Sequence, residues 1–362
     1  MNRPPPGDRV SVSAKVPRLW NDETEFKLTS DASGNNDAAC VDISDGVAYV
    51  SGSVNDNGYE TACYWTCILR DSASGTSVGR DLISLPDTGA GDAKAHAVRV
   101  DGNTVYLPGY QSDSVKSACY WVDAEDSAPV QHILPLPDGA SGDSEAYAVF
   151  TRNGVVYLAG YYTDASGDKV ACYWTDSSAS AVRLIVSDYD SEAFSVFVDE
   201  SGTVYTAGHR STGEAETDAI ACYWVGPGDR SVDLSTSASD AKGILVEDGL
   251  IYLAGSDYAT ADSLTRACYW TDSVLDDGEG PVRALLDSGA TTSYAFSLCR
   301  TDSTLYVAGF YISGGGTTVA AYWTDSLSDD SEAPERVQLS DGSTDAAAWS
   351  VSVGYVKTSQ DE

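Results

Sequence analysis

The sequence predicts an all-β protein, a seven-bladed β-propeller of four-stranded antiparallel blades, and three observations support this prediction. A strand-like motif, VYLAGY at 156–161, recurs as VYLPGY at 105–110, VYTAGH at 204–209, IYLAGS at 251–256 and LYVAGF at 305–310. A second motif, ACYW, follows it at 118–121, 171–174, 221–224 and 267–270, and also occurs at 62–65, with AAYW at 320–323. Tryptophans of this series stand at 20, 65, 121, 174, 224, 270 and 323, which gives spacings of 45 to 56 residues. Repeats of about 40–50 residues with several short strands each are typical of propellers.

Each repeat contains four expected strands. In the repeat that is easiest to divide, they cover residues 95–100, 104–110, 117–122 and 130–136. A tight-turn sequence, DGN at 101–103, separates the first two strands, and equivalent turns such as RNG at 152–154 recur. We call the four strands of a repeat a, b, c and d in chain order.

The third strand of each repeat is apolar on both faces. Side chains alternate along a strand, so Cys172 and Trp174 share one face, and Ala171 and Tyr173 share the other. A strand without a polar face is expected to be buried on both sides, as in blades that pack face to face. The repeated Gly of VYLAGY, as at Gly160, indicates a bulge or a close backbone approach.

The two ends of the chain are expected to close the ring together. Strand a also occurs seven times, and its last copy, AAAWSVSV at 346–353, has no strands b, c and d behind it. The first tryptophan motif, VPRLW ending at Trp20, has no strand a before it. We therefore predict that residues 346–353 share a blade with strands from about 9–29, which would remove both exposed edges. The whole chain, 1–362, is then one domain with loose tails at 1–8 and 357–362.

The charge of the chain limits its partners. Its 21 basic and 55 acidic residues give a net charge of −34, which disfavours nucleic acid and anionic membranes. No apolar stretch reaches the roughly 18 residues of a membrane span, and MNRPPPGDRV has no hydrophobic signal region. High acidity suits either a protein from a high-salt habitat or a secreted, very soluble domain, and we expect a monomer.

The eight cysteines are predicted to be free thiols. Five of them take the same position in successive repeats, at 63, 119, 172, 222 and 268. Equivalent positions of adjacent blades lie well beyond the roughly 7 Å Cα separation that a disulfide allows. No CxxC motif or cysteine–histidine pair indicates a metal site.

The VYLAGY and ACYWTD motifs resemble a tandem bacterial repeat found in secreted or lipid-anchored proteins of spirochaetes and related bacteria. The resemblance covers nearly the whole chain and implies a β-propeller without an assigned activity. It implies an extracellular or cell-surface location and supplies no functional residue to carry over.

The candidate binding residues are those that differ between otherwise uniform repeats. At the start of strand a, the residues on either side of a recurrent Ala vary, and the d–a and b–c loops of a propeller share the face around the channel mouth. His209 begins a b–c loop that faces the same way. The predicted channel-mouth residues are Lys94, His96, Glu145, Tyr147, Glu192, Phe194, His209, Lys242, Tyr294 and Trp349.

These observations favour a non-catalytic binding or structural propeller that binds a protein, a peptide, a glycan or another small polar ligand. The alternatives are a propeller hydrolase or lyase with its site at the channel mouth, and a self-associating surface protein. The sequence contains three His and no GxSxG, Walker A, HExxH or EF-hand motif, so no catalytic residue or metal ligand is assigned. We expect no cofactor, although the Asp-rich d–a loops have the oxygen ligands that Ca²⁺ prefers.

Overall fold

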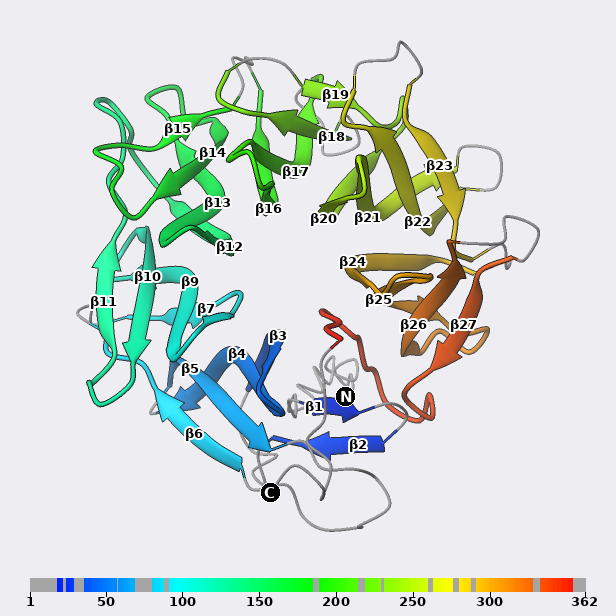
Figure 1. The fold of residues 1–362 in the computed structure, drawn as a ribbon, viewed down its shortest axis with the longest axis horizontal. Helices are drawn as coiled ribbons and strands as arrows, with labels where there is room; N and C mark the ends of the chain where they lie inside the picture. The colour runs from blue at the N-terminus through cyan, green and yellow to red at the C-terminus, as the bar shows by residue number, and fades with distance from the viewer. Residues whose placement is uncertain are drawn as a thin grey trace, which may run out of the picture.

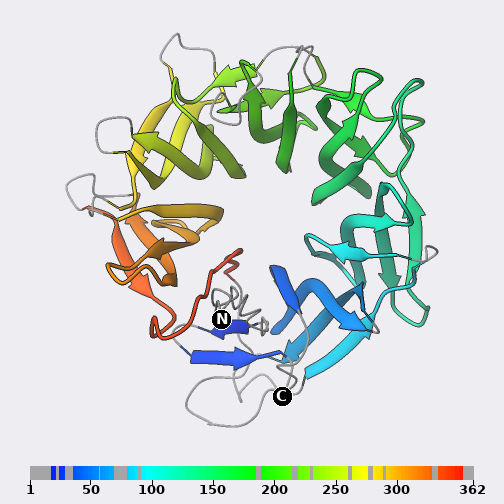
Figure 2. The same cartoon turned by 180° about the vertical axis from the view of Figure 1, so that it is seen from behind.

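The protein is a ring of β-sheets around a central opening, as Figures 1 and 2 show from opposite sides of a computed structural model. The structure describes residues 18–353 except 22–23, 29–35, 57, 69–79, 88–90, 185–188, 214–218, 229–230, 260–262, 276–279, 288–290 and 328–332. These residues form 27 strands, in keeping with the predicted all-β class. Among them no helix has the length and apolar character needed to cross a membrane. The tails predicted at 1–8 and 357–362 lie outside this range.

Six antiparallel blades make up the ring, and each takes its strands in chain order from the centre outwards. Blade 1 contains β3 (Asp37–Ser44), β4 (Val47–Asp56), β5 (Tyr59–Ile68) and β6 (Arg80–Ser84). Blade 2 contains β7 (Ala93–Ala95), β8 (Arg99–Asp101), β9 (Thr104–Ser112), β10 (Lys116–Ala124) and β11 (Val130–Ile133). Its first strand is interrupted, so that β7 and β8 both pair with β9.

The other four blades follow the same order. Blade 3 contains β12 (Ser144–Arg152), β13 (Val155–Thr163), β14 (Lys169–Thr175) and β15 (Val182–Arg183). Blade 4 contains β16 (Ser191–Val198), β17 (Val204–Ser211), β18 (Ala219–Val225) and β19 (Ser231–Asp233). Blade 5 contains β20 (Ser239–Glu247), β21 (Leu250–Ala259), β22 (Leu264–Ser273) and β23 (Val282–Leu285). Blade 6 contains β24 (Ser293–Arg300), β25 (Thr304–Ile312), β26 (Thr318–Ser326) and β27 (Glu335–Gln338).

The prediction of seven blades closed by a shared seam is wrong: the described residues form six blades. The first tryptophan motif forms only a two-stranded sheet, in which β1 (Arg18–Asn21) pairs with β2 (Thr24–Lys27). Residues 346–353 form no strand, although the Ala346 and Ala348 amides donate to the Thr318 and Gly309 carbonyls of blade 6. Figure 1 shows the β1–β2 sheet and this segment in the interval between blades 6 and 1. The motif count therefore overestimated the blades, because among the described residues the Trp20 motif forms only the two-stranded β1–β2 sheet.

The core lies between the blades, as the two-sided apolar strand c predicts. Trp174 and Cys172 of blade 3 are fully buried and pack with Ala118, Tyr120 and other residues of blade 2. The same arrangement recurs at the next interface, where Tyr173 joins the core of Trp224. All eight cysteines are free, as predicted. Each interface is thus an apolar layer in which strand c of one blade covers strands of the next.

Hydrogen bonds repeat from one blade to the next. The hydroxyl of a serine at the start of strand a accepts a hydrogen bond from the amide of the ACYW alanine in the preceding blade, as Ser144 does from Ala118 at 2.9 Å. A tyrosine hydroxyl of ACYW donates to an aspartate two residues beyond the tryptophan of the next blade, as Tyr64 does to Asp123 at 2.6 Å. These contacts explain why serine before strand a and aspartate after ACYW accompany the apolar motifs.

A bulge near the start of strand a explains the repeated glycine. The pairing register shifts immediately after Ala146, and the same shift occurs at the equivalent point of blades 1, 4, 5 and 6. There the Glu145 carbonyl lies so close to Gly160 that a Cβ on this glycine would overlap it. The Glu192 carbonyl lies equally close to Gly208 in the next blade. The glycine therefore admits the bulged backbone, and the extra residue, such as Tyr147, is redirected out of the regular alternation.

Candidate functional site

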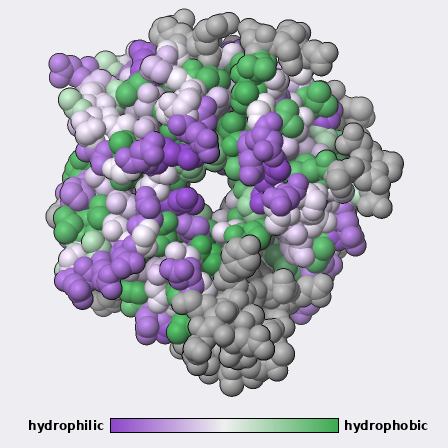
Figure 3. All heavy atoms as spheres, viewed as in Figure 1, coloured by the Kyte–Doolittle hydropathy of each residue, from purple (hydrophilic) through white to green (hydrophobic). Residues whose placement is uncertain are grey.

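In each blade the start of strand a, the end of strand b and the start of strand c lie at the same end of the channel. The registers establish this, because Glu145 on strand a pairs with Tyr161 on strand b, and Thr163 pairs with Lys169 on strand c. The space-filling view shows an open passage through the ring (Figure 3). We call the residues at these strand ends the channel mouth.

Successive bulge residues contact one another around the mouth. The ring centroids of His96 and Tyr147 are 5.2 Å apart, and those of Tyr147 and Phe194 are 5.4 Å apart. The Lys242 ammonium lies 3.2 Å from the centroid of the Phe194 ring. Blades 2 to 5 thus place one predicted site residue each on a continuous arc, since the bulge of blades 3 to 5 and the break between β7 and β8 in blade 2 fall at the same point of strand a.

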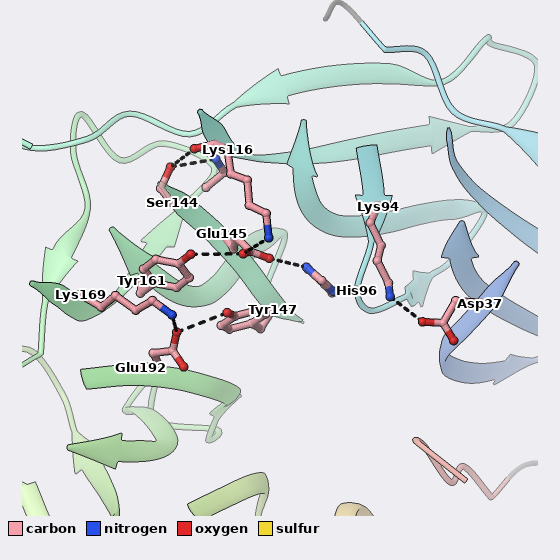
Figure 4. A network of polar contacts seen from close by, with 11 residues as sticks. Asp37, Lys94, His96, Lys116, Ser144, Glu145, Tyr147, Tyr161, Lys169 and Glu192 are labelled. Carbon is pink, nitrogen blue, oxygen red and sulfur yellow. Dashed lines mark hydrogen bonds and ion pairs between the residues drawn. The ribbon is translucent and has the colours of Figure 1, made fainter. Parts of the chain in front are cut away.

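Glu145 is the most constrained acid of the mouth. Its side chain accepts from three groups: the Lys116 ammonium at 2.7 Å, His96 Nε2 at 2.9 Å and the Tyr161 hydroxyl at 3.2 Å (Figure 4). Burial alone would raise the pKa of Glu145, but hydrogen bonds and charge from His96 and Lys116 outweigh it and lower the pKa to about 2. The carboxylate is therefore ionised and fully paired at neutral pH.

Glu192 repeats this arrangement in the next blade. The Lys169 ammonium lies 2.6 Å from its Oε1, and the Tyr147 hydroxyl donates to the same oxygen at 3.4 Å (Figure 4). In both blades the lysine also covers a tyrosine ring: Lys116 lies 4.4 Å from the Tyr110 centroid, and Lys169 lies 4.6 Å from that of Tyr161. Burial raises the pKa of Tyr147, and the charges of Glu192 and Glu145 raise it further.

The remaining ionisable candidates lie on either side of these two clusters. Lys94 forms an ion pair with Asp37 of blade 1 at 2.5 Å. Lys242 lies 3.3 Å from Asp240 Oδ2. Burial lowers the pKa of His209, an effect that Lys242 reinforces and Glu192 opposes, so the imidazole is neutral at pH 7. Among the predicted site residues and their ion-pair partners on blades 1 to 5, four lysines face four carboxylates.

An aromatic group completes the mouth on the side of blade 6. The rings of Phe296 and Trp349 are 4.5 Å apart, and Phe310 lies 5.0 Å from Tyr294 and 5.7 Å from Phe296. Trp349 comes from the segment after blade 6 and is 44% exposed. The Ser350 hydroxyl beside it lies 3.5 Å from Cys40 Sγ of blade 1, so this segment spans from blade 6 to blade 1.

The ten predicted site residues thus separate into two groups at the mouth. Eight of them, from Lys94 to Lys242, form the arc over blades 2 to 5, and Tyr294 and Trp349 belong to the aromatic group. Sequence reasoning missed four of their partners: Asp37, Lys116, Lys169 and Tyr161. The lysines stand two residues before the alanine of ACYW in two consecutive repeats, which is the signal that points to them.

The Asp-rich loops before strand a have a structural use. Oδ1 of Asp143 accepts the Lys116 amide at 2.8 Å, and Asp190 accepts the Lys169 amide at 2.7 Å. Asp92 and Asp345 accept backbone amides of strand c in the same way. In the part of the chain that the structure describes, no group of three or more metal-binding side chains is present. Asp92, Asp143 and Asp190 therefore join adjacent blades, Asp345 joins the segment after blade 6 to that blade, and the Ca²⁺ suggestion gains no support.

No family model matches the chain, and no curated protein matches it in sequence. Solved structures that resemble it include the Trypanosoma rangeli sialidase in complex with the inhibitor DANA, at 11% identity and a TM-score of 0.49. That match covers 86% of this chain and 57% of the sialidase, so the chain spans less than two thirds of the sialidase's length. The match to the RS223 β-xylosidase (14% identity, TM-score 0.35) covers 66% of this chain and 93% of the xylosidase chain. The match to the endo-arabinase from Bacteroides thetaiotaomicron (12% identity, TM-score 0.37) covers 69% of this chain and 94% of the arabinase chain. Similarity at this level carries no argument about function.

Proposed function

We propose that the protein is a non-catalytic binding propeller whose channel mouth holds a small polar ligand. The observation that carries this proposal is the pairing of the buried acids. Glu145 and Glu192, only 6% and 8% exposed, are each held by a lysine and a tyrosine. An acid–base catalyst needs a pKa near the working pH, whereas that of Glu145 is about 2.

The composition of the mouth favours a polar ligand without a large net charge. Its ion pairs match four lysines with four carboxylates, and the −34 charge of the whole chain repels polyanions. The exposed face of Trp349 and the neighbouring Phe296 offer an apolar platform beside these charges. A few polar groups around an aromatic surface are typical of small-molecule sites.

The test is a thermal-shift and calorimetric screen of uncharged glycans and small zwitterions against the intact protein. Trp349→Ala removes an exposed ring, and we expect it to weaken binding by about tenfold or more because the platform is lost. The matched control is Leu275→Ala, another exposed apolar residue (73%), which lies beyond the opposite end of strand c. A ligand that binds wild type and Trp349→Ala equally contradicts the mouth as the site. Turnover of a bound glycan contradicts the non-catalytic assignment.

A further inference from the structure

The interface between blades 4 and 5 differs from its two predecessors at one position of strand c. Lys116, Lys169 and Ala219 are equivalent, because they pair with Ser112, Thr163 and Ser211 at the same point of their blades. Each of the two lysines crosses to the acid that begins strand a of the following blade. Ala219 has no ammonium to offer the equivalent acid, Asp240.

Asp240 retains the carboxylate that this lysine would bind. Its Oδ2 lies 3.3 Å from Lys242, a residue of its own strand. Its Oδ1 is buried and has no hydrogen-bond partner among the described residues. A buried carboxylate oxygen without a donor costs stability, and a donor that reaches it regains that cost.

Within the residues that the structure describes, Lys242 is the one cation that pairs with this carboxylate. His209 replaces the tyrosine that the lysine covers in blades 2 and 3, and its ring packs against Phe194 at 5.3 Å. Burial keeps the imidazole neutral at pH 7. The Lys242 ammonium, which faces Phe194 and Asp240 Oδ2, stands beside this position as a partner for an anion.

We propose that the ammonium of an α-amino acid takes the place of the missing lysine and binds Asp240, while its carboxylate binds Lys242. Both ligand charges are attached to one carbon, which suits two protein charges that are themselves in contact. The complex then contains two cations and two anions, so no net charge is added to the site. This inference rests on the proposed function and names the ligand class of the same mouth.

The experiment is isothermal titration calorimetry of the intact protein with each of the twenty standard L-amino acids. We expect at least one to bind wild type. Ala219→Lys restores the ion pair of the preceding blades, so it should weaken this binding by about tenfold or more without lowering the melting temperature. Thr265→Lys places a lysine at the equivalent position of the next blade, opposite Tyr294, and should bind as wild type does.

Two further arms separate the two ligand charges. Lys242→Gln removes the protein cation that binds the ligand carboxylate, and the amide of the bound amino acid removes the carboxylate itself. The N-acetyl derivative of the amino acid removes the ligand ammonium. All three are expected to lose about tenfold or more in affinity. Lys242 is half-buried and takes no part in the lysine pairs of the other interfaces. Lys242→Gln therefore still tests the inference if Ala219→Lys fails to fold.

The inference is overturned if no amino acid binds wild type, or if Ala219→Lys and Lys242→Gln bind as wild type does. Its failure is distinguishable from that of the proposed function. A glycan whose binding depends on Trp349 would leave the proposed function standing while the amino acid site is rejected.

Discussion

The Lys169 ammonium lies 2.6 Å from Oε1 of Glu192 in the following blade, and the same contact joins Lys116 to Glu145 at 2.7 Å. Each pair fastens strand c of one blade to strand a of the next at the channel end. The lysine also covers a tyrosine of its own blade, so one side chain links three strands. The mouth is therefore built from the same contacts that hold adjacent blades together.

Glu145→Gln should destabilise the fold by about 3–3.5 kcal/mol at pH 7. The pKa of Glu145 is lowered from 4.5 to about 2, and each pKa unit corresponds to about 1.4 kcal/mol. A lowered pKa stabilises the folded state above the unfolded pKa, and this contribution disappears as pH falls through the folded pKa. Urea unfolding of wild type and variant should thus converge between about pH 4.5 and pH 2. A difference that stays constant over this range contradicts the ionised, paired carboxylate.

Gly160→Ala should cost more than about 3 kcal/mol or prevent folding, since its Cβ would overlap the Glu145 carbonyl at the bulge. Gly314→Ala is the control, because no atom lies within 4 Å of its Cβ position and its φ is not in the left-handed region. Chemical denaturation measures both. Equal stabilities of the two variants would show that strand a is not bulged there.

Thiol labelling should find most of the eight cysteines unreactive in the native protein and all eight reactive after denaturation. Six are buried, and burial raises the pKa of the Cys172, Cys222 and Cys268 thiols well above the usual value. Cys40 and Cys299 are the least buried and should react first. Rapid native labelling of Cys172, identified by mass spectrometry, would contradict the packed blade interface.

Added NaCl should raise the melting temperature, because 55 acidic residues against 21 basic ones repel one another in the compact state. Screening shortens the range of this repulsion to about 10 Å at 0.1 M and about 3 Å at 1 M salt. Scanning calorimetry from low salt to 1 M NaCl provides the measurement. A flat or falling melting temperature would mean that attraction within the ion pairs outweighs repulsion among the other surface charges.

The repeat motifs predicted the strands of the regular blades well, because the alternation of strand c requires burial on both faces. Blade number was predicted less well, since in the described part of the chain the Trp20 motif forms a sheet of only two strands. The bulge was indicated by Gly160, and the variable residues beside it were found at the mouth. Lys116 and Lys169 were missed because their partners, Glu145 and Glu192, lie in the following repeat, and pairing between repeats is set by the ring rather than by local sequence.

The most direct test of the binding mouth is a crystal structure of the protein with the ligand that the screen identifies. We expect electron density at the channel mouth within hydrogen-bond distance of Asp240 or Lys242, or in contact with Trp349. Density only on the outer strands, such as β11 or β23, or at the opposite end of the channel would contradict it.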